Sequence, residues 1–168
     1  TFLLQKGLRR GQYVPFSFEK SMWMVVAVLG ILKAGGAMVP IDPSQPQARV
    51  QEIMNQTNAS LVVASASQSV AFAHLFDTVE VSSHTLRNDR PNSDQTNHTL
   101  PQMRSGEPAL VLFTSGSTGK PKGIVIEHGA IATRMLVEGR AFHYRGARTL
   151  QFAATTWDIF MTDVFTTL

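Results

Sequence analysis

The sequence predicts an α/β fold with a mostly parallel sheet and flanking helices. Short strand-like runs alternate along the chain with segments of helical periodicity, which is the order expected when helices connect parallel strands. The runs at residues 61–64 and 109–113 are apolar without interruption, as in strands that are covered on both faces. A length of 168 residues and a hydrophobic fraction of 43% suffice for a globular unit with a sizeable core.

Composition and charge exclude several classes of protein. The net charge of +3 is too small for a dedicated nucleic-acid-binding protein. The absence of cysteine excludes disulfides and Cys-ligated zinc, and it fits the cytoplasm. We expect no membrane segment, because the longest uncharged apolar stretch, residues 21–32, is shorter than a bilayer span. The five histidines lack the spacing of ligand pairs, so no metal site is expected. The arginines expected on a solvated face are Arg134, Arg140, Arg145 and Arg148.

The first part of the chain has the pattern of strand, helix and strand. Residues 12–18 have the composition of a strand, and Pro15 favours a strand edge or start. Apolar residues then recur at spacings of three and four up to Gly35 and Gly36, which predicts a helix that ends there. The predicted buried face of this helix consists of Met22, Val25, Val26, Leu29 and Leu32. Residues 37–41 are expected to form a short buried strand.

The remainder continues the alternation of strands and helices. Residues 42–46 have the composition of a turn, and Pro46 suits the first turn of a following helix. The other expected elements are a helix with Val50, Ile53 and Met54, strands at 61–64, 78–81, 109–113, 123–127 and 150–153, a helix with Ile131, Met135 and Leu136, and a helix at 157–168. Residues 82–106 are polar and should form a solvated connection.

A polar, glycine-rich segment, residues 114–123, follows the expected strand at 109–113. It combines three glycines, four hydroxyl side chains and two lysines. Glycine lets the backbone approach a ligand, hydroxyl and N–H groups donate to phosphate oxygens, and lysines offset the charge of a triphosphate. The segment therefore predicts a phosphate-binding loop, with a surface turn as the alternative. A Walker loop is excluded because Pro121 follows Lys120, and a nucleophile elbow would need glycine at Ser115.

Three segments, in this order along the chain, resemble one family. Residues 114–123 match the sequence TSGSTGxPKG of the ANL adenylate-forming enzymes at every fixed position. Residues 32–49 are similar to LKAGxAYVPIDPxxPxxR of nonribosomal peptide synthetase adenylation domains, with Met38 at the usual tyrosine. Residues 151–163 resemble the FDxSxxE region of that family, and the differing positions are Trp157, Phe160 and Asp163. The resemblance implies that residues 1–168 are the N-terminal part of an AMP-binding adenylation domain.

The resemblance also implies a reaction and its site residues. The family activates an amino acid as an aminoacyl-adenylate with Mg-ATP, and the acyl group then passes to the phosphopantetheine of a carrier-protein domain in secondary metabolism. Asp158 would pair with the α-ammonium group of the substrate, and Ile159 and Thr162 would face its side chain. The residues implied to bind the ATP phosphates are Thr114, Ser115, Gly116, Ser117, Thr118, Gly119, Lys120, Lys122 and Gly123. No catalytic residue and no protein-bound metal is implied within these residues.

The later motifs of the family do not occur before Leu168. We therefore expect this segment to be inactive alone and to need the C-terminal remainder of its module. Two other functions stay open. An acyl- or aryl-acid ligase of the same superfamily is favoured if Asp158 is not an ammonium site but a polar residue at an exposed helix start. A nonenzymatic nucleotide-binding fragment is favoured if the natural protein ends near Leu168. The PIDP sequence of residues 40–43, together with Asp158, favours amino-acid activation.

Overall fold

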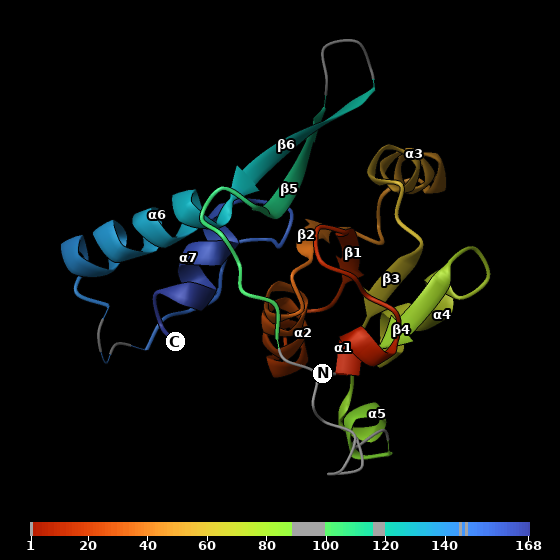
Figure 1. The fold of residues 1–168 in the computed structure, drawn as a ribbon. Helices are drawn as coiled ribbons and strands as arrows, with labels where there is room; N and C mark the ends of the chain where they lie inside the picture. The colour runs from red at the N-terminus through yellow and green to blue at the C-terminus, as the bar shows by residue number, and fades with distance from the viewer. Residues whose placement is uncertain (1, 89–99, 116–119, 145, 147) are drawn as a thin grey trace.

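The computed structural model describes residues 2–88, 100–115, 120–144, 146 and 148–168. Six strands form one sheet in the order β4-β3-β1-β2-β5-β6, with helices packed around it (Figure 1). The strands are β1 (Tyr13–Ser17), β2 (Ala37–Pro40), β3 (Leu61–Ala64), β4 (Asp77–Glu80), β5 (Pro108–Ser115) and β6 (Pro121–Glu127). The helices are α1 (Phe2–Gln5), α2 (Met22–Lys33), α3 (Gln47–Thr57), α4 (Ala66–Phe72), α5 (Ser83–Asn88), α6 (His128–Ala141) and α7 (Ile159–Phe165). Among the strands of the described residues, only the β5–β6 pair is antiparallel, so the predicted fold class is confirmed.

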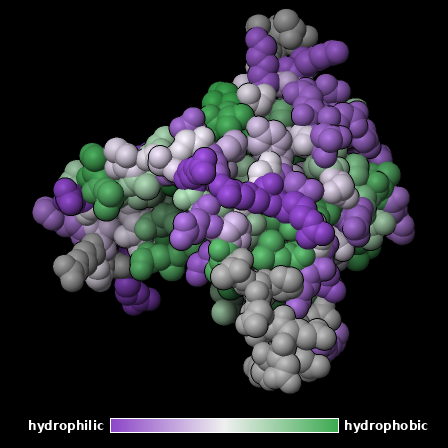
Figure 2. All heavy atoms as spheres, in the orientation of Figure 1, coloured by the Kyte–Doolittle hydropathy of each residue, from purple (hydrophilic) through white to green (hydrophobic). Residues whose placement is uncertain are grey.

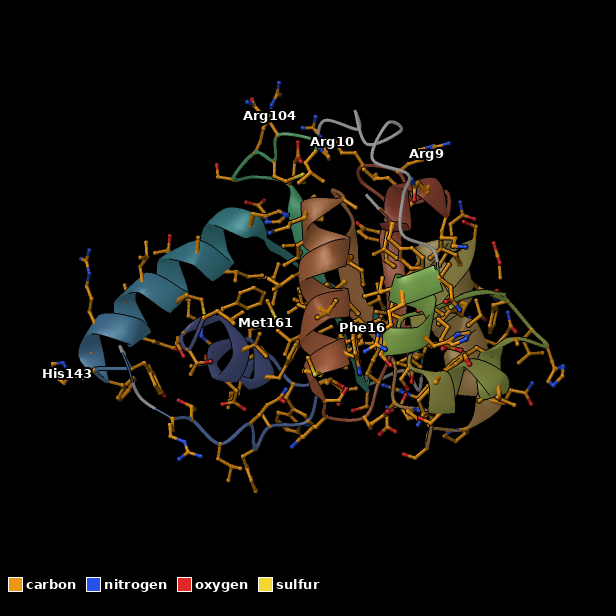
Figure 3. All side chains as sticks on the ribbon, turned by 90° about the horizontal axis from the view of Figure 1, so that it is seen from below. Arg9, Arg10, Phe16, Arg104, His143 and Met161 are labelled. Atoms are coloured by element: carbon orange, nitrogen blue, oxygen red, sulfur yellow. The ribbon has the colours of Figure 1, made fainter. Side chains whose placement is uncertain are left out.

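Each face of the sheet carries its own hydrophobic core. In β5, Leu110 contributes to one core and the next residue, Val111, to the other, as the alternation of side chains along a strand requires. Helices α1, α2 and α7 cover the first core, and α3 and α4 cover the second. In Figure 3, Phe16 and Met161 of α7 are labelled on opposite sides of α2. Burial on both faces explains why the sequences of β3 and the buried part of β5 are apolar without interruption.

Helix α2 ends where the sequence predicts, but its buried face is different. At the N-cap, the Oγ atom of Ser21 accepts a hydrogen bond from the Met24 amide at 3.3 Å. The buried side chains are Met24, Ala27, Val28 and Ile31. Met22 and Val26, predicted to be buried, are 68% and 38% exposed. The helix is apolar almost all round, so the spacing of its apolar residues indicates a helix without selecting the buried side.

Gly35 and Gly36 form the tight connection between α2 and β2. Gly35 has a φ of +85°, and a Cβ atom there would lie 3.2 Å from the Cα of Arg10. A Cβ on Gly36 would lie 2.8 Å from Val14 Cγ2 in β1, so a side chain there would require Val14 to shift. Met38, which replaces the usual tyrosine, is fully buried opposite Val14. This segment therefore has a structural role, since it packs β2 against β1.

The middle of the chain agrees with the predicted elements and adds two short helices. Helix α3 begins after Pro46 and buries Val50, Ile53 and Met54, as expected. Strands β3 and β4 lie within one residue of their predicted positions. Helix α4 was not predicted, and α5 lies inside the predicted connection at 82–106, of which residues 89–99 lie outside the described part. No helix in the described residues is long and apolar enough to cross a membrane.

The strand predicted at residues 150–153 is wrong. Side chains, not a neighbouring strand, bind the backbone there: the Ala153 amide donates to Asp163 Oδ2 at 3.1 Å, and Lys20 Nζ donates to the Phe152 carbonyl at 2.5 Å. The segment is anchored in this way to α7 and to the residue before the N-cap of α2. Helix α7 is also shorter than the predicted helix at 157–168, because it begins at Ile159 and ends at Phe165.

Candidate functional site

The predicted phosphate-binding segment lies at the end of the β5–β6 hairpin. Thr114 pairs with Lys122 and Ser115 with Pro121 across the two strands. Figure 1 shows the hairpin running out beyond the rest of the sheet, and Figure 2 shows hydrophilic residues near its end. The described hydroxyl and lysine residues of this segment are exposed, namely Thr114, Ser115, Lys120 and Lys122. The predicted residues Gly116, Ser117, Thr118 and Gly119 lie outside the described part of the chain.

Two local contacts position this end of the hairpin. Gly123 allows the Phe113 ring of the opposite strand to pack closely, because a Cβ at Gly123 would lie 3.2 Å from the ring. On the exit side, Gln56 of α3 donates a hydrogen bond from Nε2 to the Pro121 carbonyl at 3.0 Å. The hairpin is thus tied to a helix of the second core. The exposed cations and hydroxyl groups that remain suit a polyanion, which lysine binds as a point charge.

A second group of predicted site residues lies at the start of α7. Asp158 is the N-cap residue, but its side chain makes no capping hydrogen bond to the described backbone of the helix. Its Oδ2 atom instead accepts a hydrogen bond from Arg134 Nη1 of α6 at 2.6 Å. The Asp158 side chain is 46% exposed, and Ile159 beside it is 50% exposed. Thr162, one turn further, is buried and faces α6.

Arg134 and Glu138 connect these residues into one polar network. Arg134 Nε donates to Glu138 Oε1 at 2.8 Å, and Thr162 Oγ1 donates to Glu138 Oε2 at 2.7 Å. The hydrogen bonds from Thr162 and then Arg134 hold the pKa of Glu138 below its ordinary value. Glu138 and, to a smaller extent, Asp158 raise the pKa of the Arg134 guanidinium. Asp158 and Thr162 therefore belong to one hydrogen-bonded network.

Sequence reasoning missed both partners on α6. Arg134 was expected on a solvated face together with three other arginines, and Glu138 was not singled out. The spacing of this pair could have revealed it. Arg134 and Glu138 stand four residues apart in a predicted helix, and side chains at that spacing lie on the same face of the helix. The sequence gives no comparable sign that this pair would face Asp158, since that contact joins residues 24 positions apart.

A small cavity adjoins the network. It has a volume of about 110 Å³ between β5, β6, α6 and α7, and its lining includes Ile131, Met135 and Met161 together with Arg134 and Asp158. Asp158 thus borders apolar surface on one side and solvent on the other. Among the described residues, no group of three or more His, Asp or Glu side chains is placed to hold a metal ion.

The two groups of site residues are separate in the described structure. No hydrogen bond or ion pair between described residues joins the hairpin end to the Asp158 network. Figure 1 shows the end of the hairpin away from α7, with the first turn of α6 between them. A ligand could contact both groups if it extended from the hairpin end to the start of α7.

Comparison with known proteins decides the family. The model of the family described as AMP-binding enzyme matches residues 1–168. The chain belongs to the AMP-binding enzyme family. It is 60% identical over 166 residues to the nonribosomal peptide synthetase-like enzyme fsqF of Aspergillus fumigatus, and 41% identical over 172 residues to the nonribosomal peptide synthetase TES of Alternaria alternata. These matches cover 99% and 100% of this AMP-binding chain but 11% and 3% of the relatives, so the chain spans a small part of their length.

Solved adenylation structures share the fold of this AMP-binding chain. The N-terminal subdomain of Klebsiella oxytoca NpsA, in complex with 3-hydroxyanthranilyl-AMSN, matches with a TM-score of 0.76 and 27% identity, covering 98% of this chain and 40% of that one. The nonribosomal peptide synthetase FmoA3, in a form bound to α-methyl-L-serine-AMP, matches with a TM-score of 0.79 and 27% identity, covering 99% and 18%. The expected resemblance to N-terminal adenylation subdomains is confirmed.

Proposed function

We propose that this AMP-binding chain is the N-terminal part of an adenylation domain that activates an amino acid as its aminoacyl-adenylate with Mg-ATP. The observation that carries the proposal is the half-exposed carboxylate of Asp158, fixed by Arg134 at the start of α7 in a chain that also has the complete phosphate-loop sequence. FmoA3, a solved relative, is bound to an amino-acid adenylate, which supports the same chemistry here. We also propose that the protein is located in the cytoplasm, because a chain without cysteine fits a reducing compartment.

The phosphate loop would act by position and charge. An oxygen of the substrate carboxylate attacks the α-phosphorus of ATP, the bond from that phosphorus to the bridging oxygen breaks, and pyrophosphate leaves. The carboxylate is already ionised at neutral pH, so this step needs no general base. Lys120, Lys122 and the hydroxyls of Thr114 and Ser115 would hold the β- and γ-phosphates, and Mg²⁺ would arrive with ATP. The acyl group would then pass to the phosphopantetheine thiol of a carrier-protein domain.

The carboxylate of Asp158 would select the amine. A charge-assisted hydrogen bond to an ammonium group favours amino acids over acids that lack the amine. An acid without the amine would leave the exposed oxygen of the Asp158 carboxylate without a binding partner. Ile159 is exposed beside Asp158 and is available to contact the substrate side chain, whereas Thr162 is turned toward Glu138. We assign Asp158 to the amine and Ile159 to the side-chain region of the site. Thr162, which the resemblance places in that region, is buried and bonded to Glu138.

A second candidate function is activation of an aryl acid. The NpsA subdomain is also solved in complex with 3-hydroxybenzoyl-AMSN, whose acyl group carries no amine, and it shares the fold of this chain. Such an enzyme has no need for an exposed carboxylate at the acid site. Asp158 therefore favours the amino-acid substrate.

ATP–pyrophosphate exchange with the complete natural gene product that contains these residues tests the proposal. Wild-type protein should support exchange with one or a few members of a panel of amino acids, and not with hydroxy, aryl or fatty acids. Exchange with acids that lack an α-amine, but not with amino acids, would establish the ligase alternative. A folded product that supports no exchange with any acid would contradict the enzymatic proposal and favour a binding or assembly role.

Replacing Lys122 with alanine is expected to lower kcat for exchange about tenfold, because one exposed cation near the departing pyrophosphate is lost. The KM of the amino acid should stay unchanged, since Lys122 lies on the hairpin and not in the Asp158 network. Steady-state exchange kinetics measure both quantities. Lys33→Ala at the end of α2 is a matched control that should leave both unchanged. An unaltered kcat in Lys122→Ala would remove this lysine from the phosphate site.

A further inference from the structure

The polar network between α6 and α7 has the form of a closed clamp. Arg134 and Glu138 stand one turn apart on α6, and Asp158 and Thr162 stand one turn apart at α7. Arg134 contacts Glu138 and Asp158, and Glu138 also contacts Thr162, so both ends of each pair are joined. The guanidinium group uses Nε for one carboxylate and Nη1 for the other, a fork that lysine cannot reproduce.

The clamp leaves part of the Asp158 carboxylate free. Arg134 binds Oδ2, and Oδ1 has no hydrogen-bond partner among the described residues. With nearly half of the side chain exposed, a ligand can reach Oδ1 while Oδ2 remains on Arg134. The orientation of the carboxylate is therefore set by α6 before any ligand binds, which removes an ordering cost from binding.

The formal charge of the clamp is −1. Asp158 and Glu138 contribute −2 and Arg134 contributes +1. Without Glu138, the pair of Arg134 and Asp158 would be neutral and would attract a cation weakly. With Glu138, the site has one uncompensated negative charge, which a single ammonium group neutralises. Thr162, which is buried, fixes the second oxygen of Glu138 and keeps this charge next to α7.

We propose that Arg134 and Glu138 are positioning residues of the substrate-amine site: Arg134 orients the Asp158 carboxylate, and Glu138 keeps the site anionic so that it selects a substrate with a primary ammonium group. This inference rests on the proposed function and deepens it. It assigns amine selectivity to a unit of three charged side chains and one hydroxyl rather than to Asp158 alone. A clamp that merely joined the two helices would stabilise the fold without affecting the choice between substrates.

The experiment measures exchange kinetics of the complete natural gene product with two substrates, the preferred amino acid and the same acid without its amine. In Glu138→Gln, whose side chain has nearly the same shape, the KM of the amino acid should rise about tenfold, with kcat and the KM of ATP unchanged. The preference for the amino acid over its des-amino analogue, as a ratio of kcat/KM values, should fall by the same factor. Arg134→Lys keeps the charge but loses the fork, and it should lower this preference by a smaller factor.

Glu127→Gln is the matched control. Glu127 is an exposed residue immediately before α6, and it should alter neither KM nor the preference. An unchanged preference in Glu138→Gln, or equal losses for both substrates together with a lower Tm, would overturn the inference and leave the proposed function standing. A wild-type protein that shows no preference for the amine, or no exchange, would instead contradict the proposed function and this inference with it.

Discussion

Replacing Asp158 with alanine is expected to lower kcat/KM for the amino acid on the order of 100-fold, which corresponds to about 2.7 kcal/mol of lost transition-state binding. The loss has two causes, because the variant removes the partner of the substrate ammonium and leaves Arg134 without its bond to Oδ2. Exchange with the des-amino analogue should change much less. Steady-state ATP–pyrophosphate exchange with both substrates measures the difference.

One further variant separates the causes of this loss, and a second serves as the control. Asp158→Asn retains an oxygen that can accept from Arg134 but lacks the charge, so its activity should stay close to that of the alanine variant. Asp77→Ala, at the exposed start of β4 on the opposite edge of the sheet, should behave as wild type. If Asp158→Ala kept full activity toward the amino acid, Asp158 would be no more than a polar residue at a helix start.

Replacing Phe160 with alanine is expected to destabilise the packing of α7 on the sheet by about 3–5 kcal/mol. Phe160 is fully buried, and its ring centroid lies 6.4 Å from that of Phe16 in β1. Removing the ring leaves a cavity between the helix and the sheet, and α7 also supplies Met161 and Val164 to the same core. Amide hydrogen exchange in the complete gene product should show faster opening of α7 and of β1.

The control for this effect is an apolar side chain outside the core. Val70 of α4 is exposed, so Val70→Ala should change the free energy of opening by no more than about 0.5 kcal/mol. Protection of α7 that is equal in Phe160→Ala and in wild type would show that α7 does not depend on the first core. That result would also weaken the assignment of Asp158, whose place is fixed by this helix.

The position of Phe160 explains one departure from the family pattern, and Asp163 explains another. Phe160 fills the core, and Asp163 accepts the hydrogen bond that anchors Ala153 in the segment before α7. Both therefore have structural roles that support the start of the helix. Trp157 is exposed, and nothing in the structure explains its presence there.

Much of the fold follows from local sequence, because alternation, turns and caps act over a few residues. Gly35 and Pro46 mark the end of α2 and the start of α3 correctly. The buried side of α2 could not be predicted in this way, because a helix that is apolar almost all round has no polar face to mark the side that points to solvent. The false strand at 150–153 shows the same limit, because the backbone there is bound by Lys20 and Asp163 side chains.

The candidate site was predictable in part for a similar reason. The phosphate-loop residues are contiguous, so their order in the sequence alone indicates their chemistry. Asp158 could be located by its resemblance to the family pattern. The contact that orients Asp158 comes from Arg134 on another helix, and Glu138 in turn binds Arg134 and Thr162. These contacts become visible when α6 and α7 are packed together.

Direct detection of the acyl-adenylate tests the central proposal most simply. The complete natural gene product would be incubated with Mg-ATP and each amino acid that supports exchange. The products would then be separated, identified and quantified by mass spectrometry. We predict an aminoacyl-AMP and pyrophosphate in equal amounts, with the aminoacyl-AMP lost in Asp158→Ala. Formation of ADP with an acyl phosphate, or of acyl-AMP solely from acids without an amine, would contradict the proposal.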